Sequence, residues 1–313
     1  MIFDRSIFKF SVALLIFLFL APWLPQWGLF MLTIAAANGL VVLGCMLFLR
    51  AGLVSFGQAL YFCTGAYTTG LCSNFFGITD IFALLLLSAI ASGVVALLLG
   101  FLLAKYRSIF FGLLSMAFSM ILYGLLAKTE SLGSTDGFNV PSITILGYEP
   151  TLESVRVSVL AVAFFLIVLS VSFTQGLLKS PFGMLLTAIR DNEIRVEYMG
   201  ASAQKTVHSI YVIAGALAGI GGCLVAASVG HIDPTMAIWT TSGEFVFITI
   251  MGGVGSVFAP FLAALVFGII HTVAFSQSPN TWQMLLGIAL ITVIYVLPDG
   301  LWSLVQKAKK GQK

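Results

Sequence analysis

The chain has 313 residues, of which 59% are apolar and only 9% are charged, and its formal net charge is +3. A soluble globular domain carries about a quarter charged residues, so this composition excludes that class and indicates an integral membrane protein. The long apolar runs do not alternate with polar residues, which favours membrane helices of about 20 residues over the strands of a β-barrel. The basic residues form no patch, which argues against nucleic-acid binding.

The apolar runs predict an all-α polytopic membrane protein whose residues 1–313 form a single transmembrane domain in contact with lipid. We expect about ten spans, with a range of eight to ten, and at least one of them discontinuous. The expected spans are 7–24, 29–49, 53–73, 81–104, 108–127, 155–175, 207–228, 241–254, 257–275 and 281–297. The eighth of these is too short for an ordinary membrane helix.

The distribution of basic residues predicts the orientation of these spans. If the N-terminus lies in the cytoplasm, ten spans leave only Lys128 and Arg156 of the fifteen basic residues outside, as the positive-inside rule requires. Residues 128–154 then form an outer loop, residues 179–206 a cytoplasmic loop, and residues 303–313 a basic cytoplasmic tail, so both termini are cytoplasmic. In the outer loop, Asp136-Gly137 predicts a tight bend.

Residues 51–70 carry more glycine and polar residues than a lipid-facing helix would. Polar groups at membrane depth are tolerated where protein or water satisfies them, so this stretch is a candidate for a translocation path. Tight packing between helices is the alternative explanation. The candidate path residues here are Ser55, Gln58, Tyr61 and Thr64.

Residues 179–200 hold the densest group of charges in the chain. Ser180 as N-cap, Pro181 at the first helical position and Gly200 at C′ predict one helix of about five turns. One face carries Leu185, Ile189, Asn192, Val196 and Met199, and the rest of the helix is charged. Asp191 and Arg195 have the spacing of an ion pair. A helix lying on anionic lipid would be mainly basic, so the mixed charges favour docking to a soluble partner; a solvated connector is the alternative.

Two further glycine-rich segments follow. The run Gly215–Gly222 predicts close packing between helices. In 242–256, the backbone at Gly252, Gly253 and Gly255 is expected to leave the helical path, and Gly252 and Gly253 are added to the candidate path. Glu244 is the one carboxylate expected to enter a span, and it is a further candidate, with simple access to outer water as the alternative.

Chemistry for catalysis is missing from the sequence. It has no nucleophile elbow, phosphate-binding glycine loop, HExxH motif or Cys/His cluster, so we expect neither an intrinsic ATPase nor a metal site nor a membrane enzyme. The four cysteines lie in apolar segments and are expected to pack as small apolar residues. No carboxylate is expected at mid-membrane, which argues for an energy source in another subunit; a stand-alone secondary transporter or channel is the rival interpretation.

Several segments together resemble the permease subunits of high-affinity branched-chain amino acid ABC importers, specifically the second member of the permease pair. These segments are Gly52–Gln58 with Gly65–Tyr67, Gly133–Gly137, Ser180–Gly183 with Ala188–Glu193 and Gly200, Ala214–Gly219, and Gly252–Ser256. Permeases of urea and short-chain amide importers are similar, so the substrate remains open between these classes.

The resemblance implies a bacterial inner-membrane heterodimer with a related permease, two cytoplasmic subunits that bind ATP and Mg, and a periplasmic solute-binding protein that delivers leucine, isoleucine or valine. No cofactor is expected in this chain itself. The 180–200 helix would be the segment that couples to the ATPase. The implied coupling residues are Pro181, Phe182, Gly183, Arg190, Asp191, Glu193, Arg195, Glu197 and Gly200. The family pattern Glu-Ala-Ala, with glycine six residues after the glutamate, is not matched, because Glu193 precedes Gly200 by seven.

Overall fold

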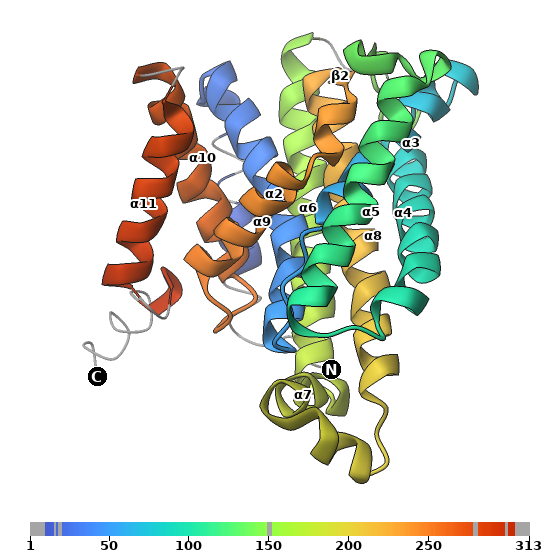
Figure 1. Cartoon of the computed structure of the whole chain (residues 1–313). Helices are drawn as coiled ribbons and strands as arrows, with labels where there is room; N and C mark the ends of the chain where they lie inside the picture. The colour runs from blue at the N-terminus through green and yellow to red at the C-terminus, as the bar shows by residue number, and fades with distance from the viewer. Residues whose placement is uncertain are drawn as a thin grey trace.

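The structure is a computed structural model that describes residues 10–15, 17, 21–148, 152–277, 281–297 and 300–303. Its helices form a bundle, with helix α7 lying beyond one end and the short strand β2 at the opposite end (Figure 1). The expected span 7–24 lies in part, and the expected tail 303–313 almost entirely, outside the described residues.

Six helices in the described part of the chain are long and apolar enough to cross a membrane. They are α2 (Gln26–Arg50), α4 (Ile81–Leu103), α5 (Ser108–Lys128), α6 (Leu152–Lys179), α8 (Ala203–Val229) and α10 (Ala259–Gln277). Each coincides with an expected span, so the predicted helical, polytopic membrane architecture is confirmed.

Three other helices correspond to further expected spans. They are α3 (Gln58–Phe75), α9 (Trp239–Gly252) and α11 (Trp282–Val296). Helices α9 and α11 have 14 and 15 residues, which at 1.5 Å per residue gives roughly 21 to 23 Å, less than the hydrocarbon thickness of about 30 Å. The count of eight to ten spans therefore stays a prediction.

Helix α8 lies at the centre of the bundle, where it packs against α2, α3 and α4. Its glycines make this possible: a Cβ on Gly219 would overlap the side chain of Ser92 in α4, and a Cβ on Gly222 would overlap the carbonyl of Phe62 in α3. Small residues at these positions let the backbones approach closely. The prediction that Gly215–Gly222 is a packing segment is confirmed.

The end of the bundle opposite α7 is closed by short elements. These are η2 (Glu130–Leu132), η3 (Ser134–Asp136), β1 (Phe138–Asn139), β2 (His231–Ile232) and η4 (Pro234–Ala237); near the N-terminus lies η1 (Ala21–Trp23). Strands β1 and β2 pair antiparallel, with Phe138 opposite Ile232. Gly137 has a φ of 69°, so the predicted bend at this glycine is confirmed. The Oδ1 atom of Asn139 lies 2.9 Å from Nδ1 of His231, which joins the two strands through side chains as well.

Candidate functional site

Helix α7 (Pro181–Tyr198) begins and ends where the sequence predicts. Ser180 occupies the N-cap position, but its hydroxyl donates to Leu177 O at 2.6 Å and does not cap the amides of α7. Gly200 has a φ of 85°, the left-handed conformation expected at C′, and its N–H donates to Glu197 O. The ends of the segment are therefore set by local turn chemistry.

The interior of α7 differs from the prediction of one continuous helix. Asn192 has φ −162° and ψ 98°, which interrupts the helix. Its Oδ1 accepts a hydrogen bond from Arg195 N at 2.9 Å, so Asn192 caps the second helical piece as an N-cap residue does. The predicted single helix of five turns was wrong, and Asp191 and Arg195 form no ion pair with each other in the described structure, because the interruption removes their i, i+4 geometry.

An ion pair joins α7 to the loop between α4 and α5. The guanidinium of Arg107 binds both carboxylate oxygens of Glu193, with Nε–Oε1 and Nε–Oε2 distances of 3.0 and 2.8 Å and an Nη2–Oε1 distance of 2.7 Å. Such bidentate contacts are the stronger and more directional class of ion pair. Arg107 also donates to Ala104 O and Tyr106 O, so its guanidinium fixes both the loop and α7.

A second contact joins α7 to the turn between α2 and α3. Gly52 in this turn has a φ of 74°, and a Cβ at that position would lie 3.1 Å from Cγ of Arg190. The stem of Arg190 therefore packs directly on the turn. Further along, Ile189 and Val196 of α7 are buried in a small cluster with Ala203. Helix α7 thus contacts two loops at the same end of the bundle.

The solvent-exposed side of the α7 segment carries apolar residues among its charged residues. Met184, Ile194, Tyr198 and Met199 are 66%, 67%, 88% and 68% exposed. Exposed apolar side chains of this size, grouped on one segment, are typical of a protein interaction surface. By contrast Phe182, assigned above to coupling, packs against the core of the bundle.

Gly183 and Pro181 take different places in the turn that leads into α7. Gly183 is buried, and a Cβ there would overlap the backbone of Leu178, so this glycine allows the sharp change of direction from α6 to α7. Pro181 is exposed at the first helical position. Contact of the predicted coupling residues with an ATPase stays a prediction.

The polar stretch 51–70 is not helical throughout, although the expected span 53–73 predicts a helix from residue 53 onward. Residues 51–57 form an irregular segment and α3 begins at Gln58. Serines satisfy its freed amides: Ser115 Oγ of α5 accepts from Phe56 N at 3.1 Å, and Ser242 Oγ of α9 accepts from Ala59 N at 2.9 Å. Non-helical backbone at this depth is tolerated because neighbouring helices provide these acceptors.

The predicted path residues of this stretch lie inside the protein. Ser55 and Gln58 are buried, and neither amide atom of the Gln58 side chain has a hydrogen-bond partner in the described part of the chain. Tyr61 is 1% exposed and packs edge-to-face on Tyr211, with ring centroids 5.5 Å apart. Thr64 is partly buried, and its hydroxyl donates to Leu60 O in its own helix. None of these four residues lines either of the two cavities described below.

Helix α9 ends within the bundle at the predicted glycines. Gly252 is its last residue and Gly253 has a φ of 79°, which confirms that the backbone leaves the helical path there. The broken end is held by other elements: Arg50 Nη2, at the end of α2, donates to Val254 O at 2.6 Å, and Leu301 N donates to Met251 O at 2.8 Å. A cation is favourable at the C-terminal end of a helix because the backbone carbonyls there carry partial negative charge.

Glu244 lies beside a cavity of about 290 Å³. The cavity is bounded by α9, α10 and α11 and by the irregular segment before α3, which contributes Phe56. Its apolar lining includes Met251, Phe267 and Leu286, and Gln283 adds an amide. A carboxylate, an amide and the threonine side chain of Thr240 in a mostly apolar cavity provide a place for a small molecule that has a cationic group and an apolar side chain.

The structure thus brings some of the predicted residues together and separates others. Phe56, next to Ser55, shares a cavity with Glu244, and Ser242 joins the start of α3 to α9, so the first and third polar stretches meet. Sequence reasoning missed Arg50 and Arg107, because both were interpreted only as topology signals at the ends of spans. Their position next to predicted turns was the available signal.

Comparison with known proteins adds the family context. Residues 28–294 match the family model described as the permease component of branched-chain amino acid transport systems. The chain is 29% identical to the high-affinity branched-chain amino acid transport system permease protein LivM of Salmonella typhimurium, over 84% of this chain and 67% of that protein. It is 28% identical to the permease protein LivM of Escherichia coli, over 96% of this chain and 77% of that protein. No solved structure matches it.

Proposed function

This chain belongs to the family of permease components of branched-chain amino acid transport systems, and from that membership we propose that it is the membrane subunit of an ATP-driven ABC importer for leucine, isoleucine and valine. The observation that carries the ATP-driven mechanism is the placement of α7. It lies outside the bundle, holds two loops on its inner side, and exposes apolar and charged side chains on its outer side (Figure 1). A segment of this kind fits a cleft on a soluble subunit.

The proposed assembly has parts on both sides of the membrane. A related second permease completes the membrane part, and two ATP-binding subunits, which hold ATP and Mg, bind α7 in the cytoplasm of a bacterial cell. A periplasmic solute-binding protein delivers the amino acid at the opposite end. Both termini of this chain lie in the cytoplasm in the proposed orientation, because most basic residues then lie inside.

Movement of α7 is the proposed route from ATP to the membrane. When the ATP-binding subunits close, α7 shifts, and the shift reaches the turn before α3 through Arg190 and the loop before α5 through Glu193. The hydrogen bond from Ala59 N to Ser242 Oγ transfers it from α3 to α9. ATP changes the balance between inward-open and outward-open states only as far as its subunits bind the two states with different free energy.

The cavity beside Glu244 supports an amino acid as the substrate. The carboxylate pairs with the ammonium group, and Met251, Phe267 and Leu286 surround a branched apolar side chain. Urea and short-chain amides have neither group, so they would leave a partly buried carboxylate without a cationic partner. The Glu244 cavity is therefore a better match to leucine, isoleucine or valine.

The experiment is purification of the tagged chain with the subunits that copurify, followed by reconstitution in proteoliposomes. Uptake of labelled leucine is expected to require ATP on the α7 side and solute-binding protein on the other side. Vesicles that hold this chain without ATP-binding subunits are the control. Uptake by these control vesicles, driven by a proton gradient, would show a stand-alone transporter and overturn the proposal. Transport of urea in preference to leucine would overturn the substrate assignment alone.

A further inference from the structure

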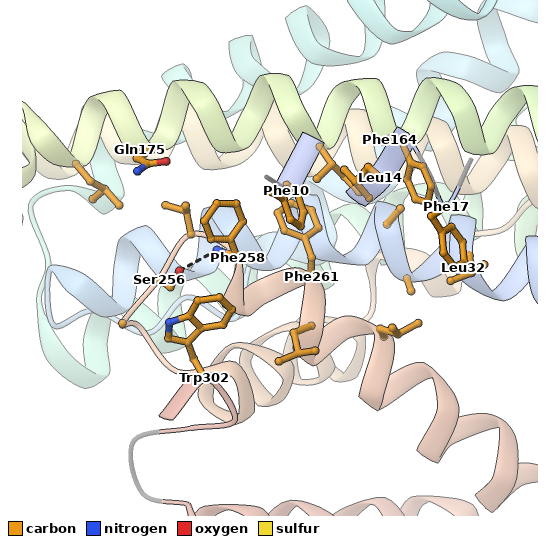
Figure 2. Close-up of a pocket in the computed structure, with 18 of the residues that line it drawn as sticks. Phe10, Leu14, Phe17, Leu32, Phe164, Gln175, Ser256, Phe258, Phe261 and Trp302 are labelled. Carbon is orange, nitrogen blue, oxygen red and sulfur yellow. Dashed lines mark hydrogen bonds between the residues drawn. The ribbon is translucent and has the colours of Figure 1, made fainter. Parts of the chain in front are cut away.

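A second cavity, of about 790 Å³, lies between α2, α6 and α10 and the helical residues near the N-terminus. Aromatic and aliphatic side chains line most of it, and they point toward one another across the space between these elements (Figure 2). The cavity is distinct from the Glu244 cavity, because no described residue lines both. None of the coupling or path residues assigned above lines it.

The two ends of this cavity differ in chemistry. Gln175, Ser256 and Trp302 lie at one end, and Phe17 and Leu32 lie at the other (Figure 2). Two cationic side chains also line this end of the cavity. They are Arg50 and Lys179, the last residues of α2 and α6. Among the described lining residues there is no aspartate or glutamate. The charged side chains among the described lining residues at this end are therefore all cations.

Arg50 has an N–H donor that no described residue accepts. Its Nη2 donates to Val254 O at 2.6 Å, whereas its Nε is buried and has no hydrogen-bond partner among the described residues. A buried guanidinium N–H without an acceptor is unfavourable by an amount comparable to a lost hydrogen bond. An anionic oxygen in the cavity would satisfy this donor.

The length of the cavity corresponds to one leaflet of a membrane. From Phe164 to Gln175 the axis of α6 rises roughly 16 Å, at 1.5 Å per residue, which is about half of the 30 Å hydrocarbon thickness. The polar end lies at the end of the bundle that carries α7, since Lys179 directly precedes the turn into α7. Trp302 at this end is typical of a residue at the membrane interface.

From this geometry we propose that the cavity binds one anionic phospholipid of the leaflet on the α7 side. An acyl chain occupies the apolar length between Phe258 and Leu32 (Figure 2), and the phosphate lies beside Arg50 and Lys179. Basic pockets between membrane helices on the cytoplasmic side bind acidic lipid headgroups in this way. A free amino acid would fill only a small part of the space, so the cavity is not a second substrate site.

Native mass spectrometry of the delipidated complex with added phosphatidylglycerol tests the headgroup. Wild type is expected to retain one phosphatidylglycerol in preference to phosphatidylcholine of the same chain length. Lys179→Gln is expected to weaken this binding about five-fold, the effect of one cation near the membrane surface. Lys205→Gln is the matched control, since Lys205 is exposed at the same end and does not line the cavity. Equal retention of both lipids, or equal effects of the two substitutions, would overturn the proposal.

The apolar end is tested separately. Leu32→Trp places bulk deep in the cavity, and it is expected to lower retention of phosphatidylglycerol and phosphatidylcholine alike. In addition, a benzophenone amino acid in place of Leu265, which lines the cavity, is expected to give an adduct with the mass of a phospholipid. A cross-link to a protein, including another part of this chain, would show a different occupant and overturn the inference. Both measurements are independent of transport, so they stand apart from the proposed function.

Discussion

Glu193→Gln removes the charged partner of Arg107 while keeping the shape of the side chain. The ion pair is bidentate, and the side chains of Arg107 and Glu193 are 24% and 30% exposed. Fully exposed ion pairs contribute about 0.2 to 1 kcal/mol, and removing one partner of a buried pair costs about 3 to 5 kcal/mol. Because Arg107 keeps two backbone carbonyl acceptors and the pair is in contact with solvent, we expect a loss of about 1 kcal/mol.

That loss corresponds to a factor of about five in the equilibrium constant between the state in which α7 is held to the α4–α5 loop and the state in which it is released. The measurement is leucine transported per ATP hydrolysed in proteoliposomes containing the complete complex. Glu193→Gln is expected to lower the number of leucine molecules transported per ATP about five-fold while ATP hydrolysis continues. The ATP-binding subunits still close, but the α4–α5 loop no longer follows α7.

A double-mutant cycle supplies the control. If the ion pair is the connection, Arg107→Gln should give at least as large a loss, because it also removes the bonds to Ala104 O and Tyr106 O, and the double variant should be no worse than Arg107→Gln alone. Thermal unfolding of each variant separates a general loss of stability from a loss of coupling. An unchanged ratio in Glu193→Gln, or effects of the two substitutions that simply add, would refute the assignment of this pair to energy transfer.

Three further predictions follow from other parts of the structure. Gly219→Ala forces α8 away from α4 and should lower stability by about 1 to 3 kcal/mol, whereas Gly176→Ala, where a Cβ meets nothing within 4 Å, should leave the unfolding temperature unchanged or slightly higher. Joint replacement of Ile194 and Tyr198 by alanine should leave unfolding unchanged but reduce the amount of ATP-binding subunit that copurifies at least ten-fold, since both side chains are exposed in the isolated chain. Glu244→Gln should slow ATP-driven leucine uptake roughly ten-fold through loss of a charge-assisted hydrogen bond, and normal uptake would remove Glu244 from the path.

The positions where the backbone must turn could be predicted from single residues. Positive φ values, which glycine adopts without steric cost, occur at Gly137, Gly200 and Gly253. Each of these bends can therefore be predicted from the glycine itself. The interruption at Asn192 could not be predicted in the same way. Asparagine fits the helical row of α7 by spacing, and only the bond from Arg195 N to its Oδ1 shows that it ends one helix and begins another.

Contacts between distant segments were harder to predict. Arg107 and Glu193 are 86 residues apart, and no periodicity relates them. The ring contact between Tyr61 and Tyr211 could not be predicted from either residue, and a place for Tyr61 on the path stays a prediction. Residue type indicates which groups need a partner at membrane depth, whereas tertiary packing decides whether that partner is protein or a transported molecule.

The paired strands β1 and β2 have a consequence for whatever docks on that end of the molecule. Residues 129–148 would be a long flexible connection if no contacts held them, and a protein that bound there would have to restrict their motion. The ladder between Phe138 and Ile232, with the side-chain contact of His231 and Asn139, has already removed much of that freedom during folding. Binding of another protein at this end therefore costs less conformational entropy than binding to a free loop would, which favours a tighter complex.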